Sequence, residues 1–525
     1  MSVVLIVGAG PTGLTLACEL AVRGVAFRLI DAAAGPFAGS RAKGVQPRTL
    51  EVFDRLGCVE EIVAGGLIGL PFRQHGANGE FRDVPRPVPE SRPDVPWPAP
   101  VLIPQWRTEA ALRARLEALG GEVEYGTALV DAAENGHVVR ARLRRADTID
   151  EIEATWLVGC DGGRSTVRRL AGLGFLGETH EDMRMLVGDL QVEGIDREHW
   201  HVWRPEGGGF LAMAPLAGSE AFQVQIGIGP NAPLDSAEAP TLASFQPLVE
   251  RYTGRSDIRL SQPTWTSLWR ANVRMVERYR AGRLLVAGDA AHVHTPAGGQ
   301  GMNTGIQDAF NLGWKLAAVE RGAPAALLDS YEAERLPVAR EVLDLSTRLV
   351  ATTLSPKTEG LVARSEDTTQ LGIRYRESPL SHERRAAPAG ALRAGDRAPD
   401  ATALLDRAGR SWRLFDLLRG PYATLLAFGA GWEALLDAGL AAASGSAGGV
   451  HALRVLAAGE STEEGGLRTL VDSRGHAGAA WLARKGEGEG ALFAIRPDGV
   501  IGFATDHRRD AEALITWLRQ AGLAH

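Results

Sequence analysis

Two glycine-rich segments contain the residue types that most clearly indicate a binding site. The first runs from Gly8 to Gly13, reads GAGPTG and has the spacing G-x-G-x-x-G. In such a turn the first glycine permits a sharp bend, the second lets the backbone approach a pyrophosphate, and the third lets strand and helix pack closely. Asp31 ends the next predicted strand, where a carboxylate accepts hydrogen bonds from a ribose hydroxyl. These residues predict a dinucleotide site, without separating NAD from FAD.

The second segment runs from Arg283 to Leu316 and passes from an apolar run through a glycine-rich loop into a helix. We expect Leu284–Ala287 to be a strand of the same sheet. Asp289 follows the carboxyl end of that strand, where ligands bind in open α/β sheets. A carboxylate there is suited to a sugar-like polyol chain. The alternative is a surface loop in which Asp289 caps the next helix.

Three glycines in this second segment, Gly298, Gly299 and Gly301, permit close approach of the backbone to a flat ring. Asn303 is expected to cap the helix that follows. The partial positive charge at the start of that helix would stabilise a negative charge on a reduced ring. The two segments would therefore hold two parts of one long cofactor, the first its pyrophosphate and the second its polyol and ring.

The elements around these segments predict an α/β fold. Val3–Val7 is a buried β-branched run, and the apolar residues between Leu14 and Ala21 recur on one helical face. With the strand that ends at Asp31 they form a βαβ unit. From about Met185 to Trp269 short alternating runs predict an antiparallel sheet inserted into this first domain.

Composition excludes several classes of function. The net charge of −7 indicates no surface for nucleic acid. The three cysteines, Cys18, Cys58 and Cys160, show neither paired nor metal-ligand spacing, so we expect a reduced, cytoplasmic protein without a metal site. The apolar N-terminal run is short and lacks a basic flank, which predicts neither a signal peptide nor a membrane span.

Three motifs together resemble the class A flavoprotein monooxygenases, the para-hydroxybenzoate hydroxylase-like aromatic hydroxylases. They are the GxGxxG turn, GCDGGRSTVR in the middle of the chain, and GDAAHVHTPAGGQGMNTGIQDAFNLGWKL further on, and the resemblance covers roughly Ser2–Arg340. It implies FAD as the cofactor, NADPH or NADH as the reductant, and dioxygen and an aromatic molecule as substrates. The implied reaction is hydroxylation through a flavin 4a-hydroperoxide.

The resemblance also implies a role for individual residues. The FAD pyrophosphate would be bound by Gly8, Gly10, Pro11, Thr12 and Gly13, the ribose by Asp31, where the family usually has Glu, and the ribityl chain by Gln105 and Asp289. The isoalloxazine would lie beside Pro296, Gly298, Gly299, Gly301, Met302 and Asn303. Arg41 would lie near the diphosphate and the nicotinamide, and Asp161 would serve both FAD and NADPH. Arg41, Pro296, Gly298 and Gly299 are the residues expected closest to the chemistry.

Substrate contacts are predicted from the inserted sheet. Aromatic walls suit a flat polycyclic molecule, although core packing is the simpler explanation for each ring. The candidates are Trp97, Trp203, Phe210, Trp265, Gln223 and Gln225. The residues indicate no base that would deprotonate a phenol.

The predicted domains follow the resemblance. A Rossmann-like FAD-binding domain spans 1–180, with strands of the substrate domain near 70–100, and resumes over 273–390 with a long helix and a linker. The antiparallel substrate domain spans 181–272. Residues 391–525 resemble the thioredoxin-like domain of aromatic-polyketide hydroxylases. This segment contains no cysteine, which excludes thiol redox chemistry and leaves packing or homodimer contacts as its expected role.

Hydroxylation of a polycyclic polyketide is the function that these observations favour. A simpler phenol is the alternative substrate, and Baeyer–Villiger oxygen insertion into a ketone is the alternative reaction. A flavin-binding scaffold without catalysis would predict bound flavin but no substrate-stimulated oxidation of NAD(P)H.

Overall fold

A six-stranded sheet forms the centre of the computed structural model, which describes residues 3–76, 79–205, 208–228, 240–295, 297–354, 366–388, 390–445, 449–460, 467–482 and 490–524. Its order is β15 (Arg280–Ala281), β16 (Leu284–Val286), β9 (Trp156–Gly159), β1 (Val4–Val7), β2 (Phe27–Asp31) and β5 (Val123–Tyr125). All neighbours are parallel except β15 and β16. The predicted Rossmann-like α/β fold is confirmed.

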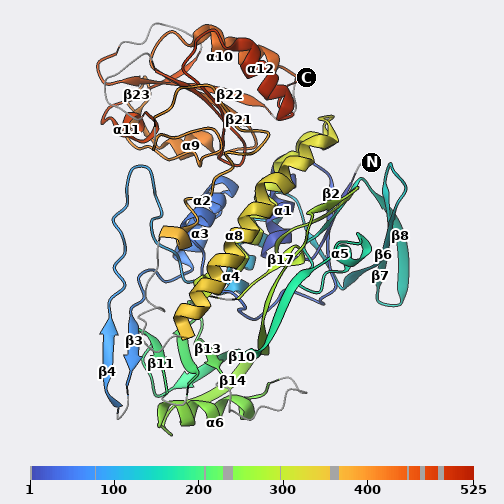
Figure 1. Cartoon of the computed structure of the whole chain (residues 1–525), viewed down its shortest axis with the longest axis vertical. Coiled ribbons are helices and arrows are strands. Elements are labelled where there is room, and N and C mark those ends of the chain that lie inside the picture. Colours follow the sequence, from blue (N-terminus) through green and yellow to red (C-terminus); the bar gives the residue numbers. More distant parts are fainter. Residues whose placement is uncertain are drawn as a thin grey trace.

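Helix α1 (Pro11–Val22) connects β1 to β2 and packs against two other helices, α4 (Gln105–Ala118) and α7 (Gly301–Glu320). Glycines at the contact let α1 and α7 approach closely, because a Cβ at Gly313 would overlap the Glu19 side chain. The long helix α8 (Asp329–Leu354) follows α7 and runs diagonally across the molecule (Figure 1). Three shorter helices complete this domain: α2 (Pro47–Leu56), α3 (Val59–Ala64) and α5 (Thr166–Leu170).

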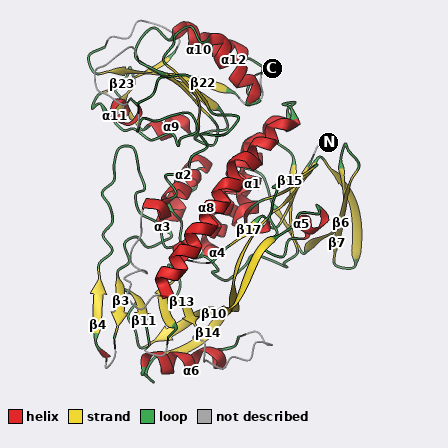
Figure 2. Ribbon diagram, viewed as in Figure 1, coloured by secondary structure: helices red, strands yellow, loops and turns green. Residues whose placement is uncertain are grey.

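An eight-stranded sheet forms the second domain, at the bottom of Figure 2. Its order is β17 (His292–Val293), β14 (Arg259–Met275), β10 (Leu176–Glu193), β13 (Ala221–Gly227), β12 (Phe210–Pro215), β11 (Trp200–Trp203), β3 (Phe72–His75) and β4 (Phe81–Val84). The pairs are antiparallel except β11 with β3. Helix α6 (Leu242–Thr253) covers one face. The long strands β10 and β14 carry this sheet past the expected range of 181–272 at both ends.

A small antiparallel sheet of β6 (Thr127–Glu134), β7 (Val139–Arg145) and β8 (Thr148–Ala154) projects from the side of the first domain (Figure 1). The sequence analysis did not predict it. Strand β7 does alternate buried apolar and exposed charged residues, whereas most residues of β8 are exposed and show no such alternation.

The C-terminal domain lies against α2 at the top of Figure 1. Its sheet has the order β18 (His382–Glu383), β25 (Ile501–Thr505), β24 (Leu492–Ile495), β21 (Ala423–Phe428), β22 (Val450–Ala457), β23 (Arg468–Asp472), β19 (Leu404–Leu405) and β20 (Ser411–Trp412). Its helices are α9 (Leu414–Leu418), α10 (Glu433–Ala442), α11 (His476–Trp481) and α12 (Ala511–Gln520). Because β18 precedes residue 391, this sheet begins inside the segment expected to be a linker.

Two further expectations concern the whole chain. Among the described residues, no helix is both long and apolar enough to cross a membrane. Cys18, Cys58 and Cys160 are free and buried, and burial raises the pKa of the Cys58 thiol to about 12.

Candidate active site

The first glycine turn lies between β1 and α1 and fits a pyrophosphate. Gly8 has a φ of +103°, and a Cβ there would overlap the backbone of Cys160, which directly follows the neighbouring strand β9. A Cβ at Gly13 would overlap the carbonyl of Gly8. At Gly10, by contrast, no atom lies within 4 Å of the Cβ position. Packing therefore requires glycine at positions 8 and 13, whereas the space beside Gly10 suits a bound ligand.

This difference predicts two distinct outcomes of substitution. Gly10→Ala is expected to leave the melting temperature of the apoprotein unchanged and to weaken FAD binding about tenfold or more, or roughly 1.4 kcal/mol. Gly13→Ala is expected to impair folding itself, because its methyl group has no room. Thermal unfolding and fluorescence titration with FAD measure both. Equal FAD affinity of Gly10→Ala and the wild type would contradict a pyrophosphate at this turn.

Asp31 lies at the end of β2 and faces the same turn. Its Oδ2 accepts a hydrogen bond from the Ala9 N–H at 2.7 Å, and its Oδ1 accepts one from the Ala33 N–H at 2.8 Å. The carboxylate is therefore held beside the glycine turn. Each of its oxygens has a further lone pair that can accept a hydrogen bond from a ribose hydroxyl.

Asp289 lies in a single turn of 3-10 helix, Gly288–Ala290, directly after β16. A Cβ at Gly288 or at Gly305 of α7 would lie 2.5 Å from the hydroxyl of Thr12. The two glycine-rich segments, far apart in sequence, thus meet at Thr12. The Asp289 side chain reaches solvent, yet surrounding protein raises the pKa of its carboxyl, while His292 and Arg41 lower it. The carboxylate is therefore accessible to a ligand and has His292 and Arg41 as its cationic neighbours.

The N-terminus of α7 corrects one expectation. Asn303 does not cap this helix, which begins at Gly301 after Gln300; it lies in the first turn with its side chain buried. Its Oδ1 accepts from the Gln46 N–H at 2.8 Å, and its Nδ2 donates to the Gly44 carbonyl at 2.9 Å. Asn303 therefore joins the segment after Arg41 to the start of α7.

Buried polar atoms without hydrogen-bond partners gather around this helix start. They are Gln46 Oε1, His292 Nδ1, His294 Nε2 and Gln300 Oε1. Such atoms are rare in folded proteins and call for a partner. Gly298 and Gly299 lie beside them with φ of +78° and +65°, and Gly301 begins α7 beside His294, followed by the partly buried Met302. This donor and acceptor set fits the polar edge of an isoalloxazine. Pro296 lies outside the described residues.

Three other predicted cofactor residues have partners within the protein. Gln105, the first residue of α4, accepts from the Ala42 N–H at 3.2 Å and donates to Glu109 at 2.8 Å. Asp161 caps α5 by accepting from the N–H groups of Thr166 and Val167. Arg41 is exposed, with its guanidinium 4.9 Å from the ring centroid of Phe37. Of the three, Arg41 is the one that is free to meet a passing ligand.

The second sheet has two different faces, and they separate the predicted substrate residues. On β13, Phe222, Val224 and Ile226 pack against α6, so the alternating Gln223 and Gln225 point to the other face. Gln223 donates to the Ser40 carbonyl and accepts from Lys43 at 2.5 Å and from Gln225 at 2.8 Å. We call this side the loop face, because residues 37–43 cross it.

Two of the predicted aromatic residues also lie on the loop face. Trp265 contacts Phe37 edge to face, with ring centroids 5.8 Å apart, and Phe210 covers Gly227. The loop face therefore brings together Phe210, Gln223, Gln225 and Trp265 beside the segment that carries Arg41.

Two predicted substrate residues are placed elsewhere. Trp203 packs into the core on the α6 face and stacks on His75 with ring centroids 4.0 Å apart. Trp97 packs where the first and C-terminal domains meet, with Arg413 over its ring at 5.2 Å. Neither residue lies with the other candidates on the loop face, because an aromatic residue in a strand or loop carries no sequence signal for the face that it occupies; their substrate contacts stay predictions.

Asp189 on β10 is a candidate that the sequence analysis missed. Its side chain is 1% exposed, lies opposite Gln223 and Trp265 in the sheet, and neither carboxylate oxygen has a hydrogen-bond partner. Burial raises its pKa to about 6, and Ser40 and Lys43 oppose the rise. An isolated acid in an alternating strand looks like an exposed residue, so only the covering loop shows its unusual position.

The raised pKa makes a stability prediction with a defined sign. Because its pKa is raised, Asp189 binds its proton more tightly in the folded state than in the unfolded state. The stability that the protonated carboxyl contributes at pH 4 is therefore lost as the pH rises through 6. Asp189→Asn is expected to raise the free energy of unfolding at pH 8 by about 2 kcal/mol and to have little effect at pH 4. Urea unfolding at both values, with the exposed Asp437→Asn as control, measures this. A gain independent of pH would contradict the assignment.

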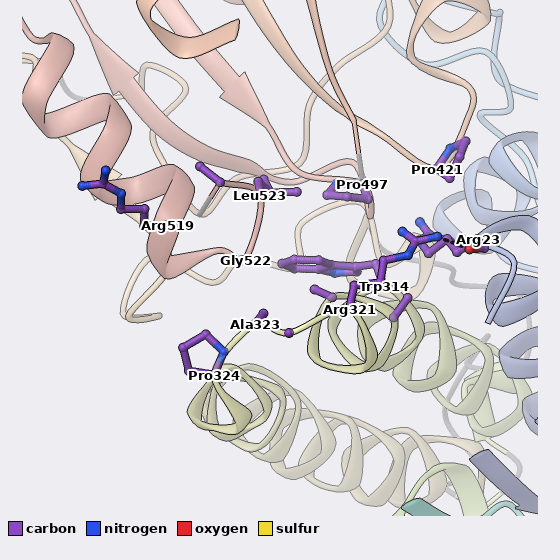
Figure 3. A pocket seen from close by; sticks show the side chains of 14 residues that line it. Arg23, Trp314, Arg321, Ala323, Pro324, Pro421, Pro497, Arg519, Gly522 and Leu523 are labelled. Atoms are coloured by element: carbon purple, nitrogen blue, oxygen red, sulfur yellow. Dashed lines mark hydrogen bonds between the residues drawn. The ribbon is translucent and has the colours of Figure 1, made fainter. Parts of the chain in front are cut away.

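One cavity of about 360 Å³ lies apart from these residues, between the ends of α1 and α7 and the C-terminal domain (Figure 3). Arg23, Trp314 and Arg321 line it from the first domain, and Leu523 lines it from the other side. No residue predicted to bind FAD or substrate is among those that line it. The described residues also contain no group of side chains that could hold a metal ion.

Comparisons with known proteins agree with this geometry. The family model described as FAD binding domain matches residues 1–346. A flavin-dependent monooxygenase from Mycobacteroides abscessus is 45% identical over 442 residues, which cover 83% of this chain and 90% of that protein. A 6-methylpretetramide 4-monooxygenase from Streptomyces rimosus is 41% identical over 349 residues, 66% of this chain and 61% of that protein.

A solved structure extends the likeness to the whole chain. The ternary complex of aklavinone-11 hydroxylase with FAD and aklavinone matches with a TM-score of 0.79 at 28% identity, covering 99% of this chain and 98% of the other. The C-terminal domain is thus part of the shared architecture. Because the family model matches more than half of this chain, the chain belongs to the FAD-binding-domain family of flavin-dependent monooxygenases.

Proposed function

We propose that this monooxygenase hydroxylates a polycyclic aromatic substrate held on the loop face, with NADPH or NADH as reductant and dioxygen as co-substrate. The observation that carries the proposal is the meeting of the two glycine-rich segments at Thr12, which brings together the Gly10 turn, the turn that carries Asp289 and α7. Relatives named for 6-methylpretetramide and aklavinone support the substrate class.

Different residues would bind different parts of FAD. The turn at Gly8–Gly13 and Asp31 would hold the pyrophosphate and ribose, Asp289 the ribityl chain, and Gly298–Gly299 the ring. Bound FAD would supply the redox chemistry, accepting a hydride from the nicotinamide and, once reduced, activating dioxygen. Asn303 would keep the Arg41 segment and the start of α7 together. The flavin ring and the nicotinamide would then bind next to each other.

The loop face would orient the substrate and exclude water. Trp265 and Phe210 offer aromatic surface for a flat molecule, and Gln225 offers an amide oxygen for a substrate hydroxyl. Gln223 already bonds to Ser40 and Lys43, which suits a supporting role for its side chain. A dry site favours oxygen transfer over loss of hydrogen peroxide.

The proposal is tested by nicotinamide oxidation with a panel of compounds. Purified holoenzyme is mixed with NADPH or NADH and with polycyclic phenols or simple phenols, and the rates of NAD(P)H loss are compared. We expect the fastest oxidation, with the least hydrogen peroxide, for a polycyclic phenol. Faster coupled turnover of a simple phenol would favour the alternative substrate, and no stimulation by any compound would favour a flavin-binding scaffold.

Arg41→Ala makes a narrower prediction about the nicotinamide. Because Arg41 is exposed, its removal should leave the melting temperature unchanged. The rate of flavin reduction by NADPH is expected to fall about tenfold, whereas FAD affinity changes less. Anaerobic stopped-flow reduction measures the rate, with the exposed Arg410→Ala as control. Unchanged reduction kinetics would refute this role.

A further inference from the structure

The C-terminal domain reaches into the first domain through the turn between β24 and β25. Arg496 in this turn is 0% exposed, and its guanidinium donates to both carboxylate oxygens of Glu334 on α8, at 2.5 and 2.8 Å. It also donates to Asp498 at 3.1 and 2.5 Å. An arginine from one domain is therefore completely enclosed by acceptors, one of which belongs to the other domain.

Glu334 is the centre of this buried cluster. Besides Arg496 it accepts hydrogen bonds from Lys315 at 2.8 Å, Asn311 at 2.6 Å and Ser378 at 2.6 Å. Two carboxylates, Glu334 and Asp498, thus balance two cations, Arg496 and Lys315, and each is at most 3% exposed. The balance holds only while the C-terminal turn is in place.

Arg335, the next residue of α8, connects this cluster to α7 and to the turn that carries Asp289. Arg335 donates to Asp308 of α7 at 2.6 Å, to the Thr304 carbonyl at 3.2 Å and to Tyr375 at 2.8 Å. The other oxygen of Asp308 accepts from the Gly288 N–H at 3.1 Å and interacts with His292 at 2.7 Å. Gly288 begins the turn that carries Asp289.

A second set of contacts reaches α2. Arg48 donates to the Asp498 carbonyl at 3.1 Å and Arg55 to the Pro497 carbonyl at 3.3 Å. Arg397 from the C-terminal side forms an ion pair with Glu51 at 2.5 Å. Gln46 precedes α2 and donates to Asn303, as described above. The same domain therefore holds α2 and α7, whose N-terminal ends meet where the flavin ring would lie (Figure 1 shows this domain above α2).

We propose that Arg496 is a positioning residue for the cofactor site. Through Glu334, Arg335 and Asp308 it holds α7 and the Gly288–Ala290 turn in the arrangement that binds FAD. The helix transmits the constraint, since Asn311 lies ten residues after Gly301, a rise of about 15 Å. The C-terminal domain, which lacks the cysteines of a redox thioredoxin, thus acts on the cofactor site by fixing its geometry.

The test compares Arg496→Met with a variant that weakens the same domain elsewhere. Leu514 is fully buried in a hydrophobic core cluster of the C-terminal domain, and its apolar side chain takes no part in the ion pairs around Glu334, so Leu514→Ala is the matched control. Hydrogen exchange of the apoproteins over residues 286–310 and fluorescence titration with FAD are measured at a temperature where both variants remain folded.

For Arg496→Met we expect faster exchange over 286–310 and an FAD dissociation constant raised about tenfold, within the range of coupling between distant sites. Arg496→Lys should recover part of the affinity, and Leu514→Ala should leave both readouts near the wild type despite its lower melting temperature. Equal effects of Leu514→Ala and Arg496→Met would overturn the proposal. If Arg496→Met does not fold, Arg496→Lys decides: wild-type exchange and affinity would overturn the proposal, and an intermediate loss would support it. A wild type that fails to bind FAD would instead refute the proposed function.

Discussion

Asp289→Ala is expected to purify as a folded protein that loses its FAD on gel filtration. The carboxylate lies on an exposed side chain directly after β16 and has no hydrogen-bond partner that anchors it elsewhere among the described contacts. Hydrogen bonds from a polyol to a charged acceptor contribute about 1.5–3 kcal/mol, so the FAD dissociation constant should rise roughly 10- to 100-fold. Flavin content after gel filtration and titration of the apoprotein measure the loss.

Two variants sharpen this result. Asp289→Asn keeps an acceptor oxygen and should fall between the wild type and Asp289→Ala. Asp437→Ala removes an exposed acid of the C-terminal domain and should retain full flavin. Full retention of FAD by Asp289→Ala would show that this turn does not hold the ribityl chain, and would favour the surface-loop interpretation.

Glu334→Ala is expected to cause the largest loss of stability. It leaves Arg496 and Lys315 buried without their shared carboxylate, and breaking a buried ion pair in this way costs about 3–5 kcal/mol. The cations hold the pKa of the Glu334 carboxyl well below its usual range. Its contribution is therefore complete above pH 5 and is lost as the pH falls below the unfolded value of about 4.3.

Urea unfolding at pH 7.5 and at pH 4 checks both the size and the sign. The difference between the wild type and Glu334→Ala should shrink at the lower pH. Glu341→Ala, which removes an exposed acid from the same helix, should change little at either pH. A loss below about 1 kcal/mol at pH 7.5 would mean that water or another group compensates the cations.

Ion pairs between the two domains give the C-terminal domain a role in stabilising the first domain. The sequence predicts only packing or homodimer contacts for residues 391–525, because the segment contains no cysteine. The structure adds Arg496, Arg397 and Arg419, which pair with Glu334, Glu51 and Asp54 of the first domain. Removing the segment would take one cationic partner from each of these carboxylates, although Glu334 keeps Lys315 and Glu51 keeps Arg48, so we expect the FAD-binding domain to lose stability as well.

Local signals account for the part of the fold that the sequence predicts. Glycine spacing, β-branched runs and helical periodicity act over a few residues, and they locate β1, the Gly8–Gly13 turn, α1, β16 and α7. The small sheet β6–β8 was missed although β7 alternates apolar and charged residues, and its mostly exposed strand β8 gives no such signal. The small strand β18 was missed because it pairs with β25, more than a hundred residues away in the chain.

Residue roles depend on contacts that no local pattern contains. Asn303 looks like a helix cap, but the helix begins two residues earlier and its amide instead holds Gly44 and Gln46. Trp203 looks like a substrate wall, but α6 covers its face of the sheet. Asp189 looks like an exposed strand residue until residues 37–43 are seen to cross above it. In each case a distant segment decides the role.

In the proposed reaction, a bound aromatic molecule receives one atom of dioxygen on its ring. It is tested most directly by turnover with isotopically labelled dioxygen, using the compound that best stimulates NAD(P)H oxidation, followed by mass spectrometry and NMR of the product. We expect one labelled oxygen, present as a new hydroxyl group on an aromatic carbon. A labelled oxygen inserted beside a ketone would show Baeyer–Villiger chemistry instead. Consumption of NAD(P)H that yields only hydrogen peroxide for every compound would contradict the proposed hydroxylation.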